Sequence, residues 1–129
     1  MNNPSIILGV PLMDRDHALL EDMLDGVAGT SDAELADLLL KVEAETRAHF
    51  EREEALMREW GVPVLSCHMV QHELLLGHFK AAHVAVAESD NDGLRSFLSD
   101  SLPALLVRHM NTADRVTAGL LANLTVAEA

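Results

Sequence analysis

The residues best suited to chemistry in this sequence are histidines that lie one helical turn from another histidine or from a carboxylate. The chain has seven histidines among 129 residues. His68 and His72 are four residues apart in "HMVQH", and Glu53 follows His49 by four residues in "HFERE". Because side chains four residues apart lie on the same face of a helix, each pair can hold one centre. Imidazole and carboxylate groups are typical ligands of transition-metal ions.

A third pair departs from this spacing. Asp114 follows His109 by five residues. Five residues of a regular helix place the second side chain about 140° away from the first. Asp114 therefore has to reach the face of His109 from its flank, or the helix has to bulge between the two residues.

The elements that must position these groups are four predicted helices. Leucine, alanine, methionine and glutamate are frequent while tyrosine is absent, which favours helix over sheet. The apolar spacing predicts helices over residues of about 13–28, 32–60, 64–88 and 94–124. Short loops make neighbouring helices antiparallel. We therefore expect a single all-α domain over residues 1–129, folded as an up-down-up-down four-helix bundle.

Prolines and capping residues predict where these helices begin. Pro4 and Pro11 discourage helix, so residues 1–12 are expected to be extended. Ser31, with Glu34 three residues later, predicts a capping box at the start of the second helix. Pro103 lies inside the fourth helix and predicts either a kink or a late start.

Each predicted helix carries at least one histidine on its apolar stripe. The inward polar groups are His17, His49, Glu53, His68, His72, His109 and Asp114. A single histidine on such a stripe is more often a hydrogen-bonded core residue than a ligand. This interpretation does not account for all seven groups together, because burying a carboxylate without a partner costs several kcal/mol of folding free energy. Metal ions in the middle of the bundle would satisfy all of them, so we predict a metal centre.

The same stripes make predictions for residues outside this set. The stripe of the third helix continues to His83 and Val86, and that of the fourth helix continues through Val116. We expect His83 to be a core histidine near the end of the bundle. His78 lies off the stripe and is expected to be exposed, and Cys67 is expected to be an ordinary free thiol.

Charge and composition exclude several classes of function. The net charge is −12 with nine basic residues, too few to make the basic face that binds nucleic acid or an anionic membrane surface. The only cysteine allows no internal disulfide. The sequence shows no signal peptide and no transmembrane stretch, so we expect a cytoplasmic protein.

The ligand pattern resembles that of the hemerythrin family, in particular its single-domain bacterial members. The resemblance runs from Gly9 to about Leu121 and rests on "GVPLMDRDH", "HFEREEALM", "HMVQH" and "HMNTAD". The sequence departs from the family at four positions, none of which we expect to touch a ligand. Asp16 stands where the family usually has glutamine, Glu21 replaces a usual aromatic residue, Val62 replaces a tyrosine, and Leu105 stands where a tryptophan is common.

The resemblance implies a di-iron centre. By it, one iron is held by His68, His72 and His109, and the other by His17 and His49. Glu53 and Asp114 bridge the two irons together with an oxo or hydroxo group. The second iron has an open position for dioxygen, in a pocket formed by Phe50, Leu106 and Met110.

The expected function is reversible dioxygen binding, as a carrier, store or sensor, rather than catalysis. Five neutral imidazoles against two carboxylates suit reversible binding, whereas di-iron oxidases use more carboxylates. Two alternatives stay open: an enzyme that removes peroxide or nitric oxide, and a protein that handles iron. We expect a monomer, which as a sensor would need a separate protein partner.

Overall fold

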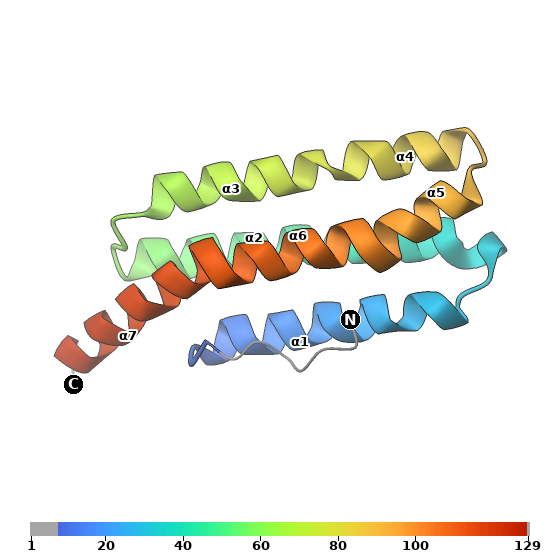
Figure 1. The fold of residues 1–129 in the computed structure, drawn as a ribbon. Coiled ribbons are helices and arrows are strands. Elements are labelled where there is room, and N and C mark those ends of the chain that lie inside the picture. The colour runs from blue at the N-terminus through green and yellow to red at the C-terminus, as the bar shows by residue number, and fades with distance from the viewer. Residues whose placement is uncertain (1–7, 129) are drawn as a thin grey trace.

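The fold consists of four roughly antiparallel helical rods (Figure 1). The structure is a computed structural model that describes residues 8–128, with side chains described as far as residue 122. The rods are α1 (Pro11–Asp25), α2 (Leu35–Glu59), α3 with α4 (Leu65–Gly77 and Phe79–Ala87), and α5, α6 and α7 in line (Asn91–Ser96, Leu102–His109 and Arg115–Glu128). The expectation of an all-α four-helix bundle is confirmed. None of the described helices has the length and apolar character needed to cross a membrane.

The first helix begins earlier than the sequence suggested. Pro11 is its first residue, so the expectation of extended backbone was wrong for Pro11 and Leu12. The part of that expectation that concerns residues 1–7 lies outside the described residues. Proline is well tolerated there, because the first helical N–H has no partner inside the helix. Asp14 accepts hydrogen bonds from the backbone N–H groups of Leu8 and Gly9, which ties the preceding chain back onto α1.

The junction between α1 and α2 is built from two 3₁₀ turns, η1 (Gly26–Gly29) and η2 (Asp32–Glu34). The predicted capping box is absent, because the side chain of Ser31 makes no capping hydrogen bond. The backbone carbonyl of Ser31 instead accepts from the N–H of Glu34. Arg95 holds this junction from the fourth rod by donating to the carbonyl oxygens of Val27 and Thr30.

Gly61 ends α2 with a turn that only a residue of positive φ allows. The N–H of Val62 bonds to the carbonyl of Met57, and the N–H of Gly61 bonds to that of Arg58. This pair of bonds is a Schellman motif, and Gly61 takes the left-handed conformation at φ +62. The turn reverses the chain into α3.

The fourth rod contains two π-helical turns, η3 (Phe97–Ser101) and η4 (Met110–Asp114). The late start that Pro103 offered as one possibility was wrong, because helical backbone already runs through η3 before the proline. The proline ring would collide with the carbonyl four residues earlier, at Ser99, and a wider turn there relieves that contact.

The third rod buries a different stripe from the one predicted beyond Phe79. Ala82 and Ala85 are buried, whereas Val86 is 38% exposed and the side chain of His83 is 45% exposed. The expectation that His83 is a core residue was wrong. The N–H of His78 bonds only three residues back, to Leu75, and this tighter turn rotates the face that follows.

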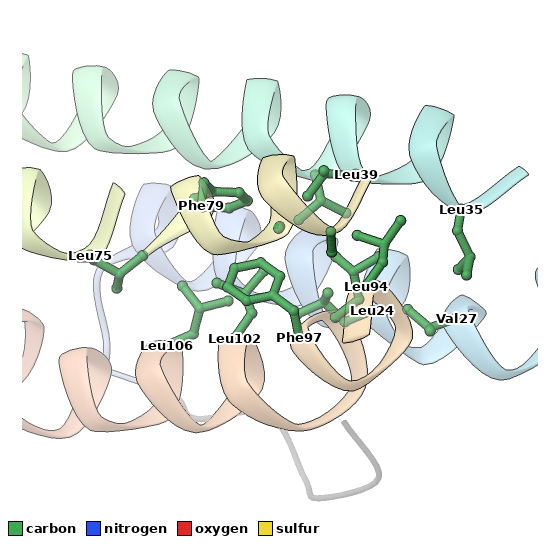
Figure 2. Close-up of a cluster of buried hydrophobic side chains, with 14 of the residues drawn as sticks. Leu24, Val27, Leu35, Leu39, Leu75, Phe79, Leu94, Phe97, Leu102 and Leu106 are labelled. Atoms are coloured by element: carbon green, nitrogen blue, oxygen red, sulfur yellow. The ribbon is translucent and has the colours of Figure 1, made fainter. Parts of the chain in front are cut away.

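The hydrophobic core forms two clusters, one on each side of the buried polar groups. The larger lies toward the α1–α2 and α4–α5 ends and includes Leu24, Leu39, Phe79, Phe97 and Leu102 (Figure 2). The smaller contains Met13, Met57, Val62, Ala118 and Leu121. On α1, α2 and the fourth rod, the inward histidines fall between residues of the two clusters. The polar centre is therefore closed off at both ends by packed apolar side chains.

Candidate metal centre

The structure brings all seven predicted ligand residues together in the middle of the bundle. They form two groups in which one donor atom from each residue lies within 4.8 Å of the others. The first group is Glu53, His68, His72, His109 and Asp114; the second is His17, His49, Glu53 and Asp114. All seven residues are buried, and the two carboxylates belong to both groups. We call these groups the five-donor cluster and the four-donor cluster.

The π turn η4 brings Asp114 onto the face of His109. A π turn places residues five apart in register, as an α turn does for residues four apart. Nε2 of His109 lies 3.0 Å from Oδ1 of Asp114. The hydroxyl of Thr112 donates to the carbonyl of Arg108, which helps to satisfy the backbone inside the wider turn. Of the two ways in which Asp114 could reach the face of His109, the structure shows the bulge in the helix.

The same turn shifts the buried stripe of α7 by one residue. Val116, expected to face inward, is 57% exposed, and Thr117 is fully buried in its place. The hydroxyl of Thr117 lies 2.7 Å from Nδ1 of His68. Sequence reasoning missed Thr117, although extending the five-residue step from His109 to the rest of the helix would have found it.

Each carboxylate directs one oxygen to each cluster. Oε1 of Glu53 lies 2.9 Å from Nε2 of His68 and 3.2 Å from Nε2 of His72, while its Oε2 lies 2.7 Å from Nε2 of His49. Asp114 does the same, with Oδ1 at 2.9 Å from Nε2 of His68 and Oδ2 at 3.0 Å from Nε2 of His17. Both side chains are placed to bridge two ions.

Most of these short contacts lack the geometry of a hydrogen bond. Within the described part of the chain, Nε2 of His17, His68 and His109 and both oxygens of Asp114 are buried without a hydrogen-bond partner. Ligand atoms that bind one ion at about 2.1 Å and at right angles lie about 3.0 Å apart. The observed spacing of 2.9–3.0 Å between Asp114 and these nitrogens therefore fits atoms that converge on metal ions.

Two of the histidines have a second carboxylate at hydrogen-bonding distance from Nδ1, the ring nitrogen that does not belong to the clusters. Nδ1 of His72 lies 2.7 Å from Oε2 of Glu54, and Nδ1 of His49 lies 3.0 Å from Oδ2 of Asp16. An imidazole that donates its Nδ1–H in this way presents the lone pair of Nε2 to the centre. The expectation that Asp16 touches no ligand was therefore wrong. Asp16 also accepts from Nε of Arg52 at 2.8 Å. Burial raises the pKa of Asp16, but the hydrogen bonds from Arg52 and His49 outweigh it and leave that pKa lowered.

In the metal-free protein the centre binds protons tightly. Burial lowers the pKa of His17 and His68, but the nearby Asp114 and Glu53 carboxylates outweigh burial and raise both values to about 9. Burial likewise raises the pKa of Asp114, and contacts with His109, His17 and His68 bring it well below its ordinary value. Metal ions and protons therefore compete for the same nitrogens.

The three residues predicted to form the pocket are all buried beside the centre. Phe50 stacks on His72 with ring centroids 3.8 Å apart and planes at 6°, and it also contacts the rings of His49 and His109. Leu106 and Met110 belong to the same hydrophobic cluster as Phe50. Their role in binding a ligand stays a prediction.

The remaining predicted or unusual residues lie outside the two clusters. His78 is exposed, as expected, and Cys67 is a free thiol, also as expected, that lies at the surface. His83 interacts with Glu43 at the surface. Glu21, four residues after His17, is 5% exposed, so a carboxylate is buried on α1 where the family resemblance led us to expect an aromatic side chain.

Comparison with known proteins identifies the family. Residues 8–121 match the family described as "Hemerythrin HHE cation binding domain". The chain belongs to the hemerythrin family. The match spans all four rods and includes all seven residues of the two clusters.

A curated hemerythrin has a related sequence. The chain is 30% identical over 115 residues to a protein named "Bacteriohemerythrin" from Ralstonia nicotianae (strain ATCC BAA-1114 / GMI1000). The alignment covers 89% of this hemerythrin chain and 83% of its relative. No solved structure gives a significant match.

Proposed function

We propose that this hemerythrin holds two iron ions, one in each cluster, and binds dioxygen reversibly at the ion of the four-donor cluster. The ligands are the seven residues His17, His49, Glu53, His68, His72, His109 and Asp114, with an oxo or hydroxo group as a further bridge. When bound, the two irons supply dioxygen with electrons and recover them on its release.

The observation that carries the proposal is the unequal sharing of imidazoles around two shared carboxylates. Three histidines serve the five-donor cluster and two serve the four-donor cluster, while Glu53 and Asp114 give one oxygen to each. An ion in the four-donor cluster therefore meets one protein donor fewer, which leaves room for a small ligand. An ion in the five-donor cluster would meet three imidazoles and both carboxylates.

We infer that three buried apolar side chains limit the access of water to the four-donor cluster. Phe50, Leu106 and Met110 are each no more than 2% exposed. Apolar side chains beside a reactive centre exclude water and anions that would displace a bound ligand. We assign these three residues to the wall of the dioxygen pocket.

Visible spectroscopy of the iron-loaded protein tests this function. The reduced protein is expected to be colourless, to colour on exposure to oxygen and to bleach under vacuum through several cycles, with two irons per chain by metal analysis. A stable oxidised product on first exposure, with turnover of peroxide or nitric oxide, would support an enzyme instead. Iron that dissociates readily during purification would support a role in iron handling.

We also propose that the protein is a cytoplasmic monomer that acts through a separate partner if it is a sensor. The exposed thiol of Cys67 suits a reducing compartment. Light scattering of the purified chain should give the mass of one chain, and a mass of two or more chains would contradict this assignment.

A further inference from the structure

The two imidazoles of the four-donor cluster, His17 and His49, differ in the hydrogen bonding of their Nδ1 atoms. Nδ1 of His49 donates to the carboxylate of Asp16, whereas Nδ1 of His17 has no hydrogen-bond partner among the described residues. In this cluster His49 is thus the imidazole with a defined donor nitrogen. The partner that defines it comes from another rod, because Asp16 lies on α1 and His49 lies on α2.

Asp16 is held as a charged, nearly buried group. Its side chain is 4% exposed, and one oxygen, Oδ2, accepts both from His49 at 3.0 Å and from Nε of Arg52 at 2.8 Å. Arg52 is permanently protonated and continues to Glu45 at the edge of the bundle through a 2.6 Å contact. A chain of charged hydrogen bonds therefore runs outward from the centre through His49, Asp16 and Arg52.

We propose that Asp16 is a positioning residue of the metal centre that acts through His49. The hydrogen bond from Arg52 determines how strongly Asp16 affects His49 as a ligand. A carboxylate that accepts the Nδ1–H of an imidazole fixes its tautomer and orientation and makes Nε2 a stronger donor. Arg52 donates a hydrogen bond to the same oxygen, so it weakens the hydrogen bond that Asp16 accepts from His49.

This arrangement predicts effects of opposite sign for two neighbouring residues. Asp16→Asn keeps the shape of the side chain but removes its charge, so His49 becomes a weaker ligand. Arg52→Gln removes the competing donor, so Asp16 acts on His49 alone and the ligand becomes stronger. A role for Asp16 and Arg52 in stability alone would move both variants in the same direction.

The proposal rests on the metal centre proposed above, and a metal other than iron separates the two. Full-length protein stripped of metal is titrated with Co²⁺ against a coloured chelator. We expect Asp16→Asn to weaken one of the two binding steps by about 10–100-fold, and Arg52→Gln to tighten the same step. Asp22→Asn and Arg47→Gln, which change the charge of exposed residues on α1 and α2, are the matched controls and should leave both steps unchanged.

Iron-loaded protein provides the second readout. The reduction potential should shift upward in Asp16→Asn and downward in Arg52→Gln, because a stronger donor stabilises the oxidised ion. If Asp16→Asn binds Co²⁺ as wild type does, or if both variants weaken the same step, the role assigned to Asp16 is wrong. If the Co²⁺ results are as expected but two irons do not load, the proposed function fails while the role of Asp16 stands. Arg52 is 37% exposed, so its variant remains informative even if Asp16→Asn folds poorly.

Discussion

At the residue scale, Leu106 combines a packing role with a position next to the centre. It is 2% exposed, lies on α6 one turn before His109, and packs in the cluster that contains Phe50 and Met110. Truncation of a buried leucine costs about 2–5 kcal/mol of folding free energy in general. A functional role must therefore be separated from this expected loss of stability.

We predict that Leu106→Ala still binds two irons and oxygen but autoxidises much faster, and faster again with added azide. The reason is that the cavity left by the side chain admits water and anions to the centre. The decay of the oxygenated spectrum measures the rate. Leu102→Ala, which removes the same volume from the same cluster one turn farther away, is the control. Equal rates in the two variants at matched iron content would mean that Leu106 is only a core residue.

At the scale of elements, η4 determines both a ligand and the register of α7. The π turn accommodates five residues where an α turn has four, so Asp114 follows His109 on the same face and Thr117 follows on the next turn. The wider turn is therefore equivalent to one residue inserted into a regular helix at Met110–Asp114.

We predict that deletion of Ala113 is tolerated. The deletion converts η4 into an α turn, in which the aspartate follows His109 by four residues and the rest of α7 keeps its buried face. Deletion of Glu51, an exposed residue of α2 between His49 and Glu53, should instead abolish metal binding, because a regular helix cannot absorb it. Circular dichroism measures the helical folding of the two deletion variants, and titration measures how many Co²⁺ ions each of them binds. If both deletion variants lose metal binding, η4 is not equivalent to one residue inserted into a regular helix.

At the scale of the whole molecule, the buried centre links folding to pH in the metal-free state. The pKa of His17 and of His68 is raised from 6.5 to about 9 in the folded protein. A raised pKa contributes stability that is complete below the unfolded value and is lost as pH rises through the folded value. The metal-free protein should therefore lose stability between about pH 6.5 and pH 9.

We predict that the melting temperature of chelator-treated protein falls over this range and that added metal reduces the fall, because metal ions replace the protons. Thermal unfolding followed by circular dichroism measures it. The double variant His17→Gln, His68→Gln should flatten the dependence, whereas His83→Gln, which changes a surface histidine, should not. A melting temperature of metal-free wild type that rises from pH 6.5 to pH 9 would refute the linkage.

The sequence by itself determined the bundle and its inward histidines. Apolar residues and ligands share one helical period, so the face that each helix buries carries His17, His49 or His68 to the centre without knowledge of the neighbouring helices. Local spacing also located Glu53, because it lies one turn from His49 on a regular helix. These features depend on backbone geometry within a single element.

Only the tertiary structure decided the features that depend on a second element or on an irregular turn. The five-residue step from His109 to Asp114 left two possibilities open, a reach from the flank or a bulge. The folded protein decided for the bulge η4, and with it for the inward position of Thr117 and the exposure of Val116. The pairing of Asp16 with His49 joins residues 33 apart in the chain, and that of Glu54 with His72 joins residues 18 apart. Such contacts arise from the packing and rotation of one helix against another, and helical spacing within either element carries no record of them.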